Sequence, residues 1–384
     1  MRHSLRLFVF VLLGLLAACT QPVKPQPPPP PAPPPPVAAP VAPAPPAAPA
    51  QSATPPVLSV EKEEAFIIEA AKTSGMAPAE IRAWLAQARY QQSIINAITR
   101  PAEGKPWKDY RPIFLTETRI RQGRDFYIEH RDELNKVSAQ TGVPAEIIVS
   151  IIGVETSYGR IAGTYRVLDA LYTLGFFYPR REEFFRGELA NLFALAKEDG
   201  LDLATLKGSY AGAMGWGQFM PSSYRDFGRD GDGDGKRDLL GSPKDAFASI
   251  ANYFIGHGWQ TGQPAFVPAI ANVGAAPFVP EDFVAKYSLA DLAARGYRPR
   301  DAGAPDLPAT LLTLEGVNGP EYWIGYQNFY VITRYNRSPL YAMAVWQLAR
   351  EIAAGVNSAP ATGNSPTASS VPTAGNAASV SNTP

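Results

Sequence analysis

A single glutamate, Glu155, lies at the end of an apolar segment, in the stretch IIGVETSYGR over residues 151–160. In a helix, Ile148, Ile151 and Ile152 take positions i, i+3 and i+4 of one face, and Glu155 completes that face at i+7. Loss of hydration on an apolar face raises the pKa of a carboxyl group, and the negative end of the helix dipole acts in the same direction. Such a group suits general acid catalysis at a glycosidic oxygen.

The alternative for Glu155 is a purely structural role. A glutamate at a helix end often turns its carboxylate to solvent or pairs it with an arginine, and Arg160 and Arg166 are close in sequence. No second carboxylate stands next to Glu155, although folding could bring Asp169 or Glu182 to it. One residue alone therefore does not decide between the two roles.

A second segment with the composition of a ligand-binding loop is GAMGWGQFMPSSY, residues 212–224. Its three glycines flank Trp216 and allow a ligand to approach the backbone closely, and the Gln218 amide would hydrogen-bond an acetamido group. No lysine or hydroxyl residue follows at the spacing of a phosphate-binding loop. The alternative is close packing of helices across the glycines.

The loop DGDGDGKRD, residues 230–238, predicts a cation site. Its aspartates take positions 1, 3, 5 and 9 of an EF-hand-like pattern with glycine at position 6, but Gly241 replaces the usual glutamate at position 12. Asp245 is the nearest substitute, and its alternative role is capping of a helix after Ser242. Because adjacent carboxylates repel one another without a cation, we expect a structural Ca²⁺ and no cofactor for the chemistry. The candidate ligands are Asp230, Asp232, Asp234, Lys236, Asp238 and Asp245.

The elements that position these segments are predicted to be mainly helical. Apolar residues at helical spacing predict two short helices separated by Gly75 and Pro78, then a third helix over residues 116–140. Pro144 stands near the start of the helix that carries Glu155, where its missing N–H costs little.

The pattern changes over residues 262–333, where β-branched and aromatic runs alternate with polar residues. Asn318-Gly319 is typical of a hairpin turn, and residues 289–294 predict a short helix. We expect a small β-rich subdomain here and a return helix over residues 334–355.

Both ends of the chain are predicted to lie outside the fold. Residues 1–18 join a basic start to an apolar stretch too short to span a bilayer, as in a signal peptide. Cys19, the only cysteine, follows Leu-Ala-Ala as in a bacterial lipobox, so we expect lipidation and no internal disulfide. Residues 19–57 form a Pro/Ala-rich spacer, and residues 356–384 are expected to be disordered. Thr20, in place of aspartate, favours the outer membrane of a Gram-negative bacterium, with the protein in the periplasm.

Composition excludes one class of partner. The 384-residue chain has 35 basic and 35 acidic residues, so no basic surface argues for nucleic-acid binding. With 17 tyrosines and 6 tryptophans it suits stacking on sugar rings, although most aromatic residues are expected in the core.

Taken together, ETSYG and GAMGWGQFMPSSY resemble the lysozyme-like core of bacterial lytic murein transglycosylases. The order of the other matching segments, over roughly residues 58–353, points to the membrane-bound lytic murein transglycosylase B family. These segments are YPRR (178–181), NYF through HGW (252–259), TRYNRS (333–338) and YAMAVW (341–346). The resemblance implies a mainly α (α+β) fold: a helical, lysozyme-like core with an EF-hand-like loop at 230–245 inside residues 58–261, an additional helical domain and the small β-rich insert.

The resemblance also implies an activity. Members cleave the MurNAc–GlcNAc β-1,4 bond of peptidoglycan without water and leave a 1,6-anhydroMurNAc end. Glu155 would protonate the leaving oxygen, the substrate's N-acetyl group would stabilise charge at C1, and the Glu155 carboxylate would then deprotonate the C6 hydroxyl as it attacks. The alternatives are a hydrolytic muramidase, which commonly uses two carboxylates, and a non-catalytic peptidoglycan-binding lipoprotein.

The matched motifs imply a substrate groove around Glu155. Expected partners are glycan strands, the membrane through the lipid anchor, and proteins of cell-wall synthesis or division; we expect a monomer. For each tyrosine of the groove the alternative is core packing with its hydroxyl satisfied. The groove candidates are Ser209, Gln218, Tyr253, Tyr335, Asn336 and Tyr341, with Tyr110, Arg180 and Arg181 as further candidates, the arginines for peptide-stem carboxylates.

Overall fold

The structure is a computed structural model and describes residues 57–99 and 104–358. The predicted signal peptide, the lipidated Cys19 and all but the end of the spacer lie outside these residues, as does the tail from residue 359. The helix predicted to return after the β-rich insert runs to Ser358, three residues beyond its expected end.

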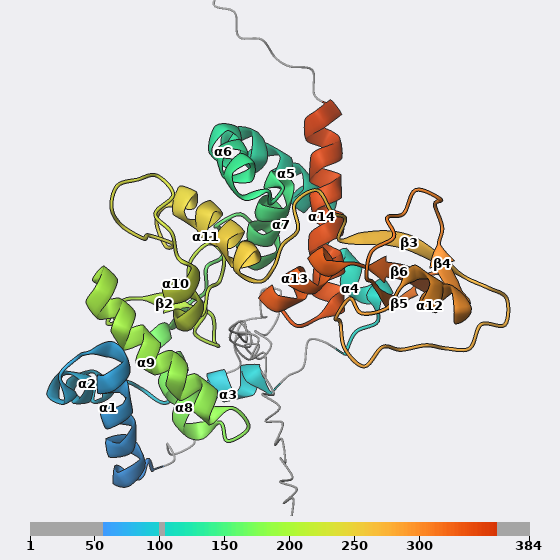
Figure 1. The fold of residues 1–384 in the computed structure, drawn as a ribbon. Coiled ribbons are helices and arrows are strands. Elements are labelled where there is room, and N and C mark those ends of the chain that lie inside the picture. Colours follow the sequence, from blue (N-terminus) through green and yellow to red (C-terminus); the bar gives the residue numbers. More distant parts are fainter. Residues whose placement is uncertain (1–56, 100–103, 359–384) are drawn as a thin grey trace, which may run out of the picture. The chain divides into compact units, whose positions relative to one another are not determined.

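Most of the described chain is helical, and strands are confined to a short pair and one sheet (Figure 1). The helices are α1 (Val60–Ser74), α2 (Pro78–Leu85), α3 (Gln92–Ile98), α4 (Trp107–Phe114), α5 (Glu117–Glu129), α6 (Arg131–Thr141), α7 (Ala145–Thr156), α8 (Val167–Phe177), α9 (Glu182–Asp199), α10 (Pro221–Phe227), α11 (Pro243–Gly256), α12 (Leu289–Ala294), α13 (Gln327–Tyr335) and α14 (Pro339–Ser358). The strands are β1 (Tyr165–Arg166), β2 (Lys207–Gly208), β3 (Phe266–Ala271), β4 (Tyr297–Pro299), β5 (Thr310–Gly316) and β6 (Gly319–Gly325).

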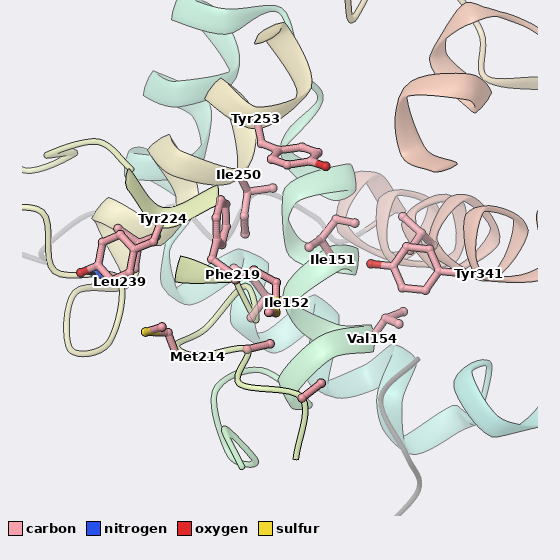
Figure 2. Packing of buried hydrophobic residues seen from close by; sticks show 14 of the residues in the cluster. Ile151, Ile152, Val154, Met214, Phe219, Tyr224, Leu239, Ile250, Tyr253 and Tyr341 are labelled. Carbon is pink, nitrogen blue, oxygen red and sulfur yellow. Dashed lines mark hydrogen bonds between the residues drawn. The ribbon is translucent and has the colours of Figure 1, made fainter. Parts of the chain in front are cut away.

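Helix α7 occupies the centre of the helical part, where it packs against α5, α6, α11 and α14. Its sequence explains this position, because ten of its twelve residues are buried and its apolar side chains point to all sides. Ile151 and Ile152 belong to the same apolar cluster as Phe219 and Ile250, with Tyr341 on the other side of α7 (Figure 2). The helix is therefore held rigidly at its C-terminal end.

The prediction of one continuous helix over residues 116–140 is wrong, because the chain bends within this range and forms two helices, α5 and α6. The break falls at His130, which has φ −108° and ψ 24° and ends one helix while starting the next. Its imidazole ring lies 4.5 Å from the Phe126 ring and 5.5 Å from the Phe247 ring, between centroids. The bend is thus fixed by contacts with α11, which lies more than a hundred residues away in sequence.

The sheet is antiparallel with strand order β4-β3-β6-β5, and the expected hairpin joins β5 to β6. Gly319 supports this tight turn with φ 110°. Helix α12 has the predicted bounds, and Ser288 and Asp291 form a capping box at its start. The β-rich insert ends earlier than expected, because residues 327–335 form α13. Its apolar residues Phe329, Val331 and Ile332 are buried at helical spacing, which sequence alternation alone did not distinguish from a strand.

Within residues 57–99 and 104–358, no single helix is both long and apolar enough to cross a membrane. One bent pair, α6 with α7, meets the criterion by length and composition alone.

Candidate active site

Glu155 is the penultimate residue of α7 and lies on the face of the buried Ile148, Ile151 and Ile152. The side chain is partly buried, and its Oε1 accepts a hydrogen bond of 2.6 Å from the hydroxyl of Tyr341 on α14. Burial raises the pKa of Glu155 from its ordinary value of 4.5 to about 8, and the hydrogen bond from Tyr341 limits that rise. Glu155 is therefore largely protonated at neutral pH and able to donate a proton.

The alternative ion pairs do not form. Arg160 donates a hydrogen bond to Gln122, and Arg166 pairs with Asp169. Among the described residues, no ion pair involves Glu155. The carboxyl group is thus controlled by burial and by Tyr341.

A left-handed turn ends α7 directly after the carboxyl-bearing residue. Ser157 and Tyr158 have φ values of 51° and 63°, a region that costs a non-glycine residue about 1–2 kcal/mol. The Tyr158 hydroxyl donates a hydrogen bond of 2.8 Å to the Arg119 carbonyl, and Thr156 Oγ1 lies 3.0 Å from the Trp216 carbonyl. These contacts hold the strained turn in place, so the side chain of Glu155 stays on the edge of the apolar core.

The Tyr158 ring fits against α7 only because residue 153 is glycine. A Cβ added at Gly153 would lie 2.7 Å from the ring and hydroxyl of Tyr158. We expect Gly153→Ala to lower the free energy of unfolding by about 1–3 kcal/mol through overpacking, measured by urea denaturation.

The matched control is Gly187→Ala in the interior of α9, where an added Cβ meets nothing within 4 Å. Because alanine favours a helix over glycine, this variant should be more stable by up to about 1 kcal/mol. Equal effects of the two substitutions would contradict the role assigned to the Tyr158 contact.

Three of the predicted tyrosines gather near Glu155. Tyr341 contacts it directly, and the Tyr335 hydroxyl donates to the Gly217 carbonyl at 2.5 Å. Burial, followed by the charge of Glu155, raises the pKa of Tyr335 well above its ordinary value. The Tyr253 hydroxyl donates to the Arg334 carbonyl at 2.6 Å, and its ring lies 4.9 Å from that of Tyr335. The hydroxyl groups of Tyr253 and Tyr335 thus have backbone partners, as in the core-packing alternative.

The other groove candidates take different positions. Gln218, with φ 50°, donates 3.1 Å hydrogen bonds from Nε2 to the carbonyls of Ala162 and Gly215. Ser209 Oγ accepts from the amides of Ala211 and Ala213 at 3.3 and 3.1 Å and closes a turn. The hydrogen bonds of Ser209 and Gln218 therefore stabilise the conformation of the glycine-rich segment and the turn before it.

Two more candidates are almost fully enclosed. Asn336 follows the last residue of α13 and is 2% exposed, and its Oδ1 has no hydrogen-bond partner among the described residues. Tyr110 on α4 is also buried. The pKa of Tyr341 is raised by burial first, then by Glu155 and Tyr335, and by Tyr110 as well, so Tyr110 lies near the Tyr341 ring. An unsatisfied buried acceptor such as Asn336 Oδ1 is rare and points to a ligand donor.

The predicted arginine pair lies at the start of α9. Arg180 is exposed, while the Arg181 guanidinium stands 4.5 Å and 5.0 Å from the ring centroids of Phe184 and Phe185. Burial lowers the pKa of Arg181, which Glu188 opposes. No ion pair joins either arginine to Glu155 in the described part of the chain.

In the EF-hand-like loop, three of the six predicted ligands converge. One carboxylate oxygen each from Asp230, Asp232 and Asp245 lies within 4.8 Å of the others. Asp245 is buried and accepts the amides of Gly231 and Asp238 at 2.8 and 2.7 Å, so it closes the loop on α11. Three hard oxygen ligands on an enlarged loop fit Ca²⁺.

The remaining predicted ligands are not part of this group. Asp234 Oδ1 accepts the Lys236 amide at 2.8 Å, and Asp238 Oδ1 accepts the amides of Leu240 and Gly241. Both carboxylates therefore stabilise turns of the loop. Asp245 also takes the expected capping position, since its own amide donates to Ser242 Oγ at 3.3 Å.

The sequence favours a cation loop that fixes Gln218 and Tyr253 on either side of the site, but it does not show which residues join the loop to the glycine-rich segment. The Trp216 amide donates to the Leu239 carbonyl at 3.2 Å, and its indole Nε1 donates to the Leu240 carbonyl at 3.1 Å. The buried Glu188 of α9 holds the same segment from another side, because its carboxylate accepts hydrogen bonds from the amide and hydroxyl of Ser222 at 2.9 and 2.7 Å. The available sequence signal for this tether was the position of Glu188 at helical spacing from Phe185 and Leu192, on an apolar helix face.

A family model described as the transglycosylase SLT domain matches residues 60–350. The chain belongs to this transglycosylase family. It is 43% identical over 300 residues to the membrane-bound lytic murein transglycosylase B of Escherichia coli, an alignment that covers 76% of this chain and 82% of that protein. The transglycosylase is therefore a peptidoglycan-cleaving lyase with a lysozyme-like fold.

Solved structures agree with this assignment. The soluble lytic transglycosylase SltB1 of Pseudomonas aeruginosa, in its catenated form, is 49% identical with a TM-score of 0.73, covering 78% of the transglycosylase and 98% of that chain. Escherichia coli Slt35 in complex with calcium is 42% identical with a TM-score of 0.71, covering 77% and 94%. SltB3 of Pseudomonas aeruginosa in complex with NAG-NAM-pentapeptide is 31% identical with a TM-score of 0.65, covering 77% and 80%.

Proposed function

We propose that Glu155 alone supplies the acid and the base of the lytic reaction. The observation that carries this is a carboxyl group with a pKa of about 8 on an apolar helix face, hydrogen-bonded by Tyr341. Protonated Glu155 gives its proton to the glycosidic oxygen as the bond from C1 breaks, and the leaving sugar departs as an alcohol. The substrate's N-acetyl oxygen stabilises the positive charge at C1.

The second step returns Glu155 to its starting state. The carboxylate takes the proton from the C6 hydroxyl of the same sugar while that oxygen bonds to C1, which forms the 1,6-anhydro ring and consumes no water. Tyr341 supports this step, because its hydroxyl stabilises the carboxylate that exists between the two proton transfers.

A common hydrolytic mechanism requires a second carboxylate, and the two candidates that folding could have brought to Glu155 have other partners. Asp169 accepts hydrogen bonds from Arg166 and from the Arg89 amide, and Glu182 pairs with Lys62 at 2.6 Å. Because both carboxylates are held by these hydrogen bonds and ion pairs, the lyase is favoured over the muramidase. The test is mass spectrometry of products from purified peptidoglycan, where the lyase gives muropeptides lighter by one water than a muramidase does.

We also assign the substrate groove to side chains around Glu155. Gln218 and Asn336 carry the amide groups, and the unpaired Oδ1 of Asn336 would accept an acetamido N–H of the sugar. Tyr335 and Tyr253 supply the aromatic wall, with Tyr110 behind Tyr341. Ser209 contributes through the turn that it closes, and Arg180 with Arg181 would meet carboxylates of the peptide stem.

For the cation loop we propose Ca²⁺ held by Asp230, Asp232 and Asp245, by analogy with the calcium complex of Slt35. The ion would be structural: it neutralises three carboxylates and fixes the loop that hydrogen-bonds Trp216, two residues before Gln218.

Removing the ion tests this role. We expect a calcium chelator to lower the melting temperature by several degrees, and Asp245→Asn to abolish that response, because Asp245 binds the ion and closes the loop. The matched control, Asp238→Asn, leaves the three-carboxylate group intact and should keep the response. A chelator without effect on the unmodified protein would contradict the calcium site.

The location of the enzyme is also proposed from its sequence. Cys19 would carry the lipid, and residues 19–57 would let the catalytic part reach glycan strands from the outer membrane, on the periplasmic side. The Escherichia coli relative is named as membrane-bound, which supports an anchor. We propose that it works as a monomer beside proteins of cell-wall synthesis or division.

A further inference from the structure

A cavity of about 890 Å³ lies between the sheet and α14, away from Glu155. Trp323 of β6 and Trp346 of α14 line it, with ring centroids 5.4 Å apart. Trp346 follows Tyr341 by five residues on α14, which turns it by roughly 140° about the helix axis. The cavity therefore opens on another face of the helix that supplies Tyr341 to the catalytic carboxyl group.

Arginines without carboxylate partners line this cavity. The Arg350 guanidinium lies 5.1 Å from the centroid of the Trp346 ring and has no ion pair or hydrogen bond to any described residue. Arg111 Nε donates to Gln347 Oε1 at 2.8 Å, and Arg111 forms no ion pair within 4.0 Å among the described residues. Two guanidinium groups are thus available for a bidentate contact with an anion.

The wall offers further polar groups of both kinds. Trp323 Nε1 is buried and has no hydrogen-bond partner in the described part of the chain. Its N–H is therefore an unsatisfied donor that a ligand acceptor would satisfy. Arg300 also lines the cavity, beside Asp301 at 3.7 Å, and Glu321 and Glu351 add negative charge. A ligand that fits carries carboxylates and carbonyl oxygens, an amine and small apolar groups.

We propose that this cavity binds the peptide stem of a peptidoglycan strand, separately from the sugar bond that Glu155 cleaves. Peptide stems combine free carboxylates, amide carbonyls, an amino group and methyl side chains, which match the guanidinium groups, the indole N–H, the acidic residues and the tryptophan rings. The volume lies in the range of small-molecule sites. A second contact with the same polymer raises the effective concentration of substrate at the catalytic groove. The inference rests on the proposed function for its choice of polymer.

Binding measurements with the full chain test the proposal in the Glu155→Gln background, which keeps the polymer intact. The probes are purified insoluble peptidoglycan and the same polymer after an amidase has removed its peptide stems. We expect Arg350→Glu, an exposed residue, to weaken binding to stem-bearing peptidoglycan on the order of tenfold and to leave binding to the stem-free polymer unchanged. Arg111→Gln should act in the same direction and to a smaller degree.

The matched control is Arg298→Glu, an exposed arginine of β4 in the same sheet that does not line the cavity. Binding of the control should equal that of the parent on both polymers. The peptide site is refuted if Arg350→Glu binds like Arg298→Glu. It is also refuted if Arg350→Glu loses the same amount of affinity for both polymers. Cleavage of a short stem-free glycan by the protein with Glu155 intact is measured separately, so a failure of the proposed chemistry shows there and not in the binding ratio.

Discussion

Replacing Glu155 by glutamine is expected to lower the turnover number at least about 10³-fold, because in the proposed mechanism one carboxyl group performs both proton transfers. Glutamine keeps the size and the contact with Tyr341 but neither donates nor accepts a proton at neutral pH. The measurement is the rate at which soluble anhydromuropeptides are released from purified peptidoglycan. Binding to the polymer should persist.

The matched control is Glu146→Gln, at the opposite end of the same helix, which should retain the full rate. Loss of activity in both variants would indicate damage to α7 instead of lost chemistry. A Glu155→Gln protein that still cleaves at an unchanged rate would remove this residue from the mechanism.

The same variant carries a stability prediction with a definite sign. The folded-state pKa of Glu155 is raised from 4.5 to about 8, so the native state disfavours the ionised form. The protonated carboxyl group of Glu155 therefore makes its full contribution to the free energy of unfolding below about pH 4.5. This contribution is lost as the pH rises through about 8. Glu155→Gln should be more stable than the parent at pH 8 by on the order of 1–3 kcal/mol, with the difference shrinking toward pH 4.5 in denaturant titrations.

Removing the Tyr341 hydroxyl is the second large effect that we expect. Tyr341→Phe deletes the 2.6 Å hydrogen bond to Glu155 and should lower the turnover number roughly 10- to 100-fold, the value of a hydrogen bond to a charged group. Because that bond favours the ionised carboxylate, its loss raises the pKa of Glu155 further. The alkaline limb of the plot of kcat/KM against pH, set near pH 8 in the parent, should move to higher pH.

Tyr326→Phe is the control for Tyr341→Phe. Tyr326 is equally buried and donates one hydrogen bond, to the Pro305 carbonyl at 3.1 Å, within the separate apolar cluster of the sheet. Its loss should affect stability and leave the pH profile in place. A Tyr341→Phe profile that coincides with the parent, or shifts to lower pH, would contradict the assigned hydrogen bond.

Local pattern was enough to predict helix α7, which carries Glu155, and the turns that depend on residue type. The apolar face around Glu155, the Asn318-Gly319 hairpin and the short helix α12 follow from periodicity and turn chemistry, which act within a few residues. Family motifs added the order of the segments. These features needed no knowledge of distant contacts.

Other features depend on contacts between segments far apart in the chain. The bend at His130 is fixed by Phe247, and α13 is helical because its apolar side chains meet the core at helical spacing. The hydrogen bonds of Trp216 to the cation loop involve backbone carbonyls, which carry no residue-type signal. The choice of three converging aspartates among six candidates is likewise set by the folded loop.

Cleavage in water enriched in ¹⁸O tests the central claim most directly. If Glu155 directs the C6 hydroxyl to C1, the new 1,6-anhydroMurNAc end contains only oxygen from the substrate, and mass spectrometry should find no ¹⁸O in the released muropeptides. Incorporation of one ¹⁸O at each new end would show that water attacks C1, and it would contradict the single-carboxylate lyase mechanism.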